Sequence, residues 1–154
     1  LARNPKALKR FAATFEERGV TKHYLGIVDG VPVETEGTID LALAKISSKE
    51  AGWRMIPARK GKPSLTHWRM VQPLQRGALI CFRPETGRTH QLRVHAASGL
   101  GHPLLGDPVY GQQGSAPRTM LHAAAIVVPR EGKPDIRAEA PLPRDFCMLG
   151  ARCG

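Results

Sequence analysis

The sequence predicts an α+β fold in which a mainly antiparallel, mixed sheet packs against helices. Short β-rich runs outnumber helical ones, and few of them are separated by a helical crossover of the kind that joins parallel strands. The length of 154 residues suits a single core, and no repeat or linker divides the chain. A hydrophobic content of 42% excludes a chain too polar to fold. No apolar run reaches the roughly 20 residues of a membrane helix, so we expect no membrane span.

The predicted elements begin with an amphipathic helix from Asn4, a capping residue, to Gly19. Short β-rich and apolar runs then predict the strands 22–28, 33–40, 64–71, 78–82, 119–128 and 136–140. The segment from Lys45 to Pro63 is polar and rich in turn residues, which predicts a surface loop or ribbon. A second helix is predicted between Thr89, as its N-cap, and Gly99.

Positive charge dominates the sequence and is concentrated in one segment. The chain has 23 Lys+Arg against 13 Asp+Glu, a net charge of +10. Residues 25–44 carry acidic but no basic side chains, whereas residues 45–76 carry eight basic side chains and Glu50 alone. A polyanion such as a nucleic acid is the partner that this pattern favours over a role in solubility alone.

Cysteine and histidine spacing argues against a metal site. The three cysteines include no CxxC pair, which suits free thiols in a reducing compartment and a cytoplasmic protein. His90 and His95 lie five residues apart, whereas two ligands on one helical face lie four apart.

The densest group of candidate functional side chains lies between Arg83 and His95. A Gly-Arg-Thr turn at 87–89 that opens a helix offers backbone N–H groups, a hydroxyl and a guanidinium to an anion. Arg93 differs, because apolar residues flank it and a buried arginine needs a carboxylate partner. Asp107 is one candidate for that partner, and their ion pair would hold a loop to the helix.

Tyr24, on the strand 22–28, is a candidate base-stacking residue. Packing is the more common role of a half-buried strand tyrosine, so its position alone leaves both interpretations open. Aromatic residues make up only 5% of the chain, which argues against a multi-aromatic reader of single-stranded RNA.

Two long motifs resemble the RluA-type RNA pseudouridine synthases. They are Arg83-Pro84-Glu85-Thr86-Gly87-Arg88-Thr89-His90-Gln91-Leu92-Arg93-Val94-His95 and Gly101-His102-Pro103-Leu104-Leu105-Gly106-Asp107-Pro108-Val109-Tyr110-Gly111. Shorter matches in family order extend the resemblance over nearly the whole chain: Lys22-His23-Tyr24, Gly61-Lys62-Pro63, Leu121-His122-Ala123 and Ala140-Pro141-Leu142-Pro143.

The resemblance implies a pseudouridine synthase fold, with residues 1–154 forming part of one catalytic domain. It implies isomerisation of uridine to pseudouridine in ribosomal or transfer RNA, with no cofactor and no metal. Arg93 would pair with the catalytic aspartate rather than with Asp107, Tyr24 would stack on the flipped uracil or act as a base towards it, and Leu92 would line the pocket. Candidate RNA-binding residues are Lys22, Arg59, Lys60, Lys62, Arg83, Arg88, Thr89 and His90.

The sequence departs from the family at the nucleophile. The family's aspartate lies in a His-Arg-Leu-Asp-x-x-Thr-Ser-Gly motif, just before a stretch that resembles Leu1-Ala2-Arg3-Asn4, and no aspartate of this chain has that context. We therefore expect a domain incomplete at its N-terminus, inactive alone, and able to pair with the missing segment or with another chain. The alternatives are a non-catalytic RNA-binding module of the same fold and a binder of small phosphates at 87–89.

Overall fold

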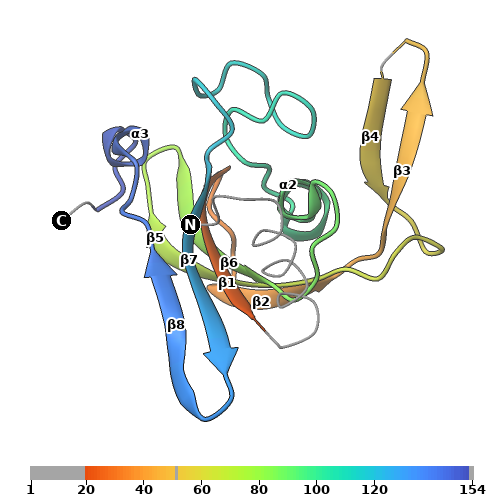
Figure 1. Ribbon diagram of the computed structural model, residues 1–154. Coiled ribbons are helices and arrows are strands. Elements are labelled where there is room, and N and C mark those ends of the chain that lie inside the picture. The colour runs from red at the N-terminus through yellow and green to blue at the C-terminus, as the bar shows by residue number, and fades with distance from the viewer. Residues whose placement is uncertain (1–19, 51, 153–154) are drawn as a thin grey trace.

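The computed structural model describes residues 20–50 and 52–152. Six strands form an antiparallel sheet in the order β2-β5-β6-β1-β7-β8, and β3 and β4 form a separate hairpin that projects from the body (Figure 1). The α+β prediction with a mainly antiparallel sheet is confirmed. The strands are β1 Thr21–Asp29, β2 Glu36–Asp40, β3 Leu43–Ser48, β4 Gly52–Pro57, β5 Leu65–Pro73, β6 Gly77–Pro84, β7 Leu121–Arg130 and β8 Lys133–Glu139.

Helical structure is short and differs in detail from the prediction. The helix expected from Asn4 to Gly19 lies outside the described residues. Helix α2 spans Gln91–Val94 and continues as the π-helical turn η1, His95–Leu100. The expected N-cap at Thr89 is wrong, because His90 precedes α2 in a left-handed conformation and no side chain caps the helix. A further helix, α3 at Arg144–Met148, lies in a segment for which no helix was predicted.

Strand alternation gives the sheet two faces with different coverings. Tyr24 pairs with Phe82, and Trp68 pairs with the same residue from the other side, so all three side chains lie on one face. This side, the α2 face, is covered by α2 and η1. The opposite side, the α3 face, carries Leu79 and Cys81.

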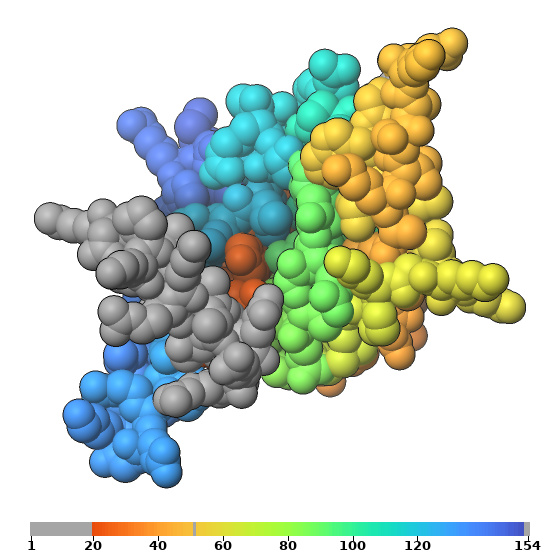
Figure 2. Space-filling model, turned by 45° about the vertical axis from the view of Figure 1, so that its right-hand side comes forward, coloured from red at the N-terminus to blue at the C-terminus, as the bar shows by residue number. Residues whose placement is uncertain are grey.

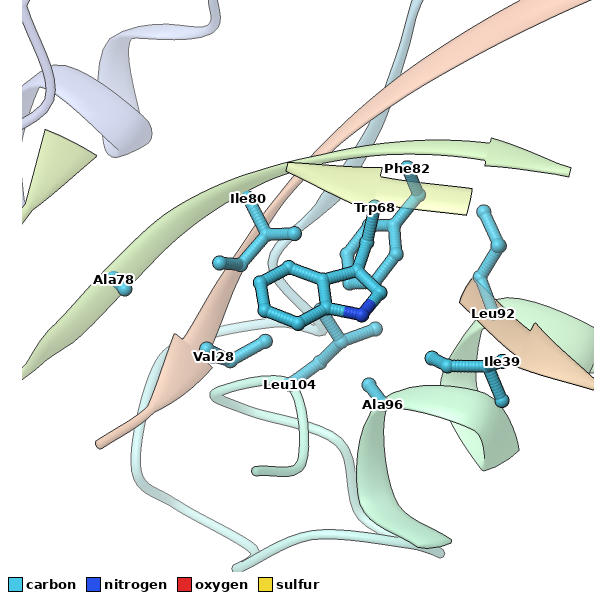
Figure 3. Packing of buried hydrophobic residues seen from close by; sticks show 9 residues of the cluster. All are labelled: Val28, Ile39, Trp68, Ala78, Ile80, Phe82, Leu92, Ala96 and Leu104. Atoms are coloured by element: carbon cyan, nitrogen blue, oxygen red, sulfur yellow. The ribbon is translucent and has the colours of Figure 1, made fainter. Parts of the chain in front are cut away.

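A separate apolar cluster lies on each face. On the α2 face the Trp68 indole lies among side chains from β1, β2, β6, α2 and η1 (Figure 3). On the α3 face Ile27 and Leu79 pack with Leu105, Met120 and Phe146 of α3. Phe82 and Phe146 are both fully buried, so each cluster fixes its covering element to the sheet.

The base of the β3–β4 hairpin is fixed to α2 by a third cluster. Leu43 of β3 and Met55 of β4 are buried with Val94 of α2, and Tyr110 packs against them. The expected loop or ribbon at 45–63 is therefore a ribbon, of which the base is packed while Lys45 and Trp53 further along remain exposed.

Two observations bear on the broader class of the protein. Cys147 is disulfide-bonded whereas Cys81 is a free thiol, so the expectation of free thiols is wrong for Cys147. Spacing along the chain does not show which thiols the fold brings within bonding distance. Among the described residues, no helix has the length and apolar character to cross a membrane.

Candidate functional site

A cavity of about 360 Å³ lies on the α2 face, between the first half of β1 and helix α2. It collects all three residues expected to act in the reaction, namely Tyr24, Leu92 and Arg93. Three of the expected RNA-binding residues, Lys22, Arg88 and His90, line the same cavity. The long motif at 83–95 thus meets β1, which lies about sixty residues earlier in the chain.

Tyr24 enters the cavity from β1 beside an irregularity in strand pairing. The register between β1 and β7 shifts between His23 and Tyr24, and such bulges often redirect a side chain next to a functional site. Burial raises the pKa of the Tyr24 hydroxyl above its usual range, so the phenol is protonated at neutral pH. This favours a stacking role for the ring over a role as a base.

The Arg93 guanidinium is held by a bidentate ion pair with Asp107. Its Nε lies 2.9 Å from Oδ2 and its Nη2 lies 2.7 Å from Oδ1 of a carboxylate that is fully buried. The expectation that Asp107 is not the partner of Arg93 is therefore wrong for this chain. The physical reason is that the 101–111 loop brings Asp107 against α2, and fork-to-carboxylate pairing is the most favourable geometry for a partly buried arginine.

Both members of this pair have shifted pKa values. Burial acts to raise the pKa of Asp107, but hydrogen bonds from Arg93 and from the backbone N–H groups of Tyr110 and Val109 outweigh it and lower the pKa. The hydrogen bond to Asp107 raises the pKa of Arg93. The pair is thus ionised at neutral pH, and Asp107 holds Arg93 in place from behind the cavity.

Gln91 organises the turn that precedes α2, a role that the sequence reasoning missed. Its side-chain oxygen accepts hydrogen bonds from the Thr86 hydroxyl at 2.6 Å and the Arg88 N–H at 3.0 Å. Its amide nitrogen donates to Leu65 O and to the Thr66 hydroxyl. A buried glutamine at the start of a helix, beside a Gly-Arg-Thr turn, was the available signal.

His95 belongs to the same buried network rather than to an RNA surface. Its Nε2 lies 2.9 Å from Leu41 O, a carbonyl that can only accept, so Nε2 carries the proton. Its Nδ1 then accepts from the Thr66 hydroxyl at 2.8 Å. His95 is fully buried and burial lowers its pKa, so the neutral ring serves to join η1 to β5.

A second cavity, of about 630 Å³, lies between the hairpin base and the 87–89 turn. Lys60, Lys62, Arg88 and Thr89, all expected to bind RNA, line it, and Lys45 joins them. Arg88 belongs to both cavities, so the two adjoin. Figure 2 shows the green segment that includes this turn lying between the start of β1 (red) and the hairpin with its following loop (orange to yellow).

Two of the expected RNA-binding residues lie apart from these cavities. Arg83 is on the α3 face, where it lines a different groove with Arg69 and His23. It follows Phe82 in β6, and successive strand residues point to opposite faces. Arg59 is exposed in the turn after β4 and lines neither cavity.

Comparison with known proteins places this site in a family. The family model described as RNA pseudouridylate synthase matches residues 1–98. An uncharacterised RNA pseudouridine synthase of Zymomonas mobilis is 51% identical over 97% of this chain and 69% of its own length. The chain belongs to the RluA-type RNA pseudouridine synthase family.

Further relatives support the same family and fold. A ribosomal large subunit pseudouridine synthase D of Zymomonas mobilis is 38% identical over 97% of the chain and 50% of its own length. The solved structure of human RNA pseudouridylate synthase domain containing 1 superposes with a TM-score of 0.72, at 33% identity over 91% of this chain and 62% of that one. The pseudouridine synthase fold predicted from the motifs is confirmed.

The pseudouridine synthase chain described here is shorter than these relatives. It spans 69% of the first relative and 50% of the second.

Among the residues that the structure describes, no carboxylate lines the cavity of Tyr24, Leu92 and Arg93. Its polar lining consists of cations, hydroxyls and amides, which suits an anionic, hydrogen-bonding ligand.

Proposed function

We propose that this chain carries the uridine-binding part of an RNA pseudouridine synthase site. The reaction breaks the C1′–N1 bond of a uridine, turns the uracil, and forms a C1′–C5 bond, so that no atom is gained or lost overall. The observation that carries the proposal is the cavity that joins Tyr24, Leu92 and Arg93 beside a basic cavity.

The two cavities would bind different parts of the RNA, the uracil base in one and the phosphates in the other. The Tyr24 ring and the Leu92 side chain offer a flat and an apolar surface to an extruded uracil, while Arg93 offers N–H donors. Extrusion costs a few kcal/mol, and contacts of Lys60, Lys62 and Arg88 with the phosphates would offset that cost.

We also propose that the 154-residue chain does not catalyse the reaction by itself. Asp107 is fully buried and engaged with Arg93, so it is not available as a nucleophile. A carboxylate supplied from outside this chain would complete the cavity. A non-catalytic RNA-binding module remains the second candidate, because RNA binding by the described lining would not require a nucleophile.

Release of tritium from RNA labelled at C5 of uridine tests the reaction. Large-subunit ribosomal RNA is the first substrate to try, with transfer RNA second. We expect no release by the 154-residue chain and measurable release by the chain extended upstream through a His-Arg-Leu-Asp motif. Release by the 154 residues alone would contradict the inactivity proposal. If the natural upstream sequence lacks this motif and the extended chain releases no tritium, the result would support the non-catalytic module.

Salt-dependent RNA binding tests the surface independently of catalysis. Arg88→Ala should weaken RNA binding several-fold and reduce the salt slope by about one phosphate contact. Arg59→Ala tests the turn after β4 in the same way, and Arg83→Ala is the matched control because Arg83 lies on the opposite face. If neither Arg88→Ala nor Arg59→Ala lowers the affinity, the surface is wrongly placed. Tight binding of inorganic phosphate with little salt dependence would favour a small-phosphate site.

A further inference from the structure

His90 lies where helix α2, the 101–111 loop and the β3–β4 hairpin meet. Its φ of 54° makes it the one residue other than glycine with positive φ in the part of the chain that the structure describes. Such a backbone costs about 1 kcal/mol or more and persists where surrounding contacts fix it. Here the ring stacks on the Trp53 indole of β4, with centroids 4.8 Å apart.

Both ring nitrogens of His90 have intramolecular partners. Nε2 lies 3.0 Å from Nη1 of Arg93, and Nδ1 lies 2.8 Å from the hydroxyl of Tyr110. A guanidinium only donates, so Nε2 must accept and must lack a proton. The neutral ring therefore carries its proton on Nδ1 and donates it to the oxygen of Tyr110.

The Tyr110 oxygen extends this chain of hydrogen bonds to the hairpin. It also accepts from the backbone N–H of Met55 in β4, at 2.9 Å. Arg93 thus donates to His90, and His90 donates to the Tyr110 oxygen, which also accepts from the Met55 N–H of β4. The Arg93 guanidinium lies 5.1 Å from the centroid of the Tyr110 ring, which adds a second contact between the same groups.

These contacts define the orientation of Arg93 more fully than Asp107 can alone. Asp107 binds Nε and Nη2, and His90 binds Nη1, so all three guanidinium nitrogens have a fixed partner. The ion pair fixes one edge of the guanidinium, and the histidine fixes the other.

We propose that His90 is a positioning residue for Arg93, acting as the neutral ring protonated on Nδ1, and that it couples Arg93 to the β3–β4 hairpin through Tyr110. The consequence for the reaction rests on the proposed function, because Arg93 lines the proposed uridine cavity. The hydrogen-bond direction itself does not depend on that function.

Acid would disrupt this arrangement. A second proton on Nε2 would face the Arg93 guanidinium, with Arg54 of β4 over the Tyr110 ring and Lys45 of β3 over Trp53 nearby. Asp107 is the carboxylate that opposes these cations. Burial and the charge of Arg93 lower the pKa of His90, with Asp107 acting in the opposite direction.

The first experiment reads the tautomer directly. In a two-bond ¹H–¹⁵N spectrum of the 154-residue chain at pH 7.5, the His90 ring should show a protonated Nδ1 and a bare Nε2, with His90→Gln identifying the signals. A proton on Nε2 would overturn the proposal. This measurement uses the wild-type chain, so it does not depend on whether a variant folds.

The second experiment separates positioning from packing. The protection of the Arg93 Nη1 protons against hydrogen exchange, taken relative to the intrinsic rate at each pH, should fall about tenfold as wild type is acidified through the His90 titration. His90→Gln keeps an acceptor near Arg93 but cannot titrate, so its protection should stay high and show no such acid step. His90→Asn tolerates the left-handed backbone but is too short to reach Arg93, so its protection should be low at every pH.

Equal Arg93 exchange in wild type, His90→Gln and His90→Asn would contradict the proposal. RNA binding by the same three proteins keeps the two hypotheses distinguishable. If the tautomer and exchange results hold but none of the proteins binds RNA, the positioning inference stands and the proposed function fails.

Discussion

The two faces of the six-stranded sheet differ in the elements that cover them and in the side chains that line their cavities. On the α2 face, Phe82 and Trp68 are buried under α2 and η1, and the polar groups beside them are paired within the molecule. On the α3 face, α3 packs against Ile27 and Leu79, and a groove of about 490 Å³ is lined by His23, Arg69 and other described residues. One sheet thus supports a hydrogen-bonded site on one side and a groove that contains two arginines on the other.

Arg83 and Arg88 show what this difference teaches. They lie five residues apart in one motif, yet Arg83 lines the α3-face groove and Arg88 lines both cavities of the α2 face. Neither Arg69 nor Arg83 has a carboxylate within ion-pairing distance in the part of the chain that the structure describes. Alternation along β6 directs Arg83 to the α3 face, whereas Arg88 lies beyond the strand, in the turn before α2.

The largest expected effect contrasts Phe82 with its neighbour Arg83. Phe82 is fully buried on the α2 face, so Phe82→Ala should lower the free energy of unfolding by about 3–5 kcal/mol. Arg83→Ala, at an exposed position of the α3 face, should change it by less than about 0.5 kcal/mol. Urea unfolding measures both variants. Similar losses for the two would contradict the difference between the faces.

The next effect contrasts one ion pair from each side. Asp107→Asn leaves Arg93 without its buried carboxylate and should cost about 3 kcal/mol of unfolding free energy. Asp145→Asn breaks the Arg118–Asp145 pair beside α3, which is partly exposed, and should cost much less. The comparison is made by urea unfolding at neutral pH. Equal losses of unfolding free energy for the two variants would show that burial of Asp107 does not strengthen its ion pair with Arg93.

A smaller effect concerns two histidines, one on each face. Burial lowers the pKa of His95, and burial together with Arg83, Arg137 and Arg69 lowers the pKa of His23. As the pH falls, these histidines are protonated at about pH 6.5 in the unfolded chain and only at lower pH in the folded chain. The free energy of unfolding should therefore fall as the pH drops below about 6.5.

Salt should distinguish these two histidines. Added salt screens the exposed arginines around His23 and should move its pKa back towards 6.5, whereas the pKa of His95, lowered by burial, should hardly change. Proton NMR titration of the ring C–H signals at low and high salt measures both. A shift of His95 as large as that of His23 would contradict this reasoning.

The smallest effect is expected for the thiol in the groove. Cys81 is half-buried, its Sγ lies 3.9 Å from Nδ1 of His23, and burial raises its pKa. Cys81→Ser should therefore alter unfolding free energy by no more than about 1 kcal/mol and leave RNA affinity unchanged. A large loss of RNA affinity would place part of the binding surface on the α3 face.

Much of the fold could be predicted because its signals are local. The β-rich run at 22–28 and the apolar run at 78–82 indicated strands, and both are present, as β1 and β6. Helix α3 was missed because it has only five residues and follows a proline-rich stretch. Phe146 is its one buried residue, so the helix has no apolar periodicity that the sequence could reveal. Thr89 was misplaced as a cap because the residue that precedes α2 is His90 in a left-handed conformation, and no side-chain cap bond forms there among the described residues.

The sequence by itself determined the class of sheet, the basic character of the hairpin region and, through its motifs, the family and the grouping of Tyr24, Leu92 and Arg93. Periodicity, charge and motif spacing are properties of neighbours along the chain, so they can be read without coordinates. Only the tertiary structure decided that Asp107 binds Arg93, that Arg83 lies on the face opposite the site, and that His90 links Arg93 to the hairpin. Each of these depends on which loops and faces meet in space, and hydrogen-bond geometry and burial exist only after the chain has folded.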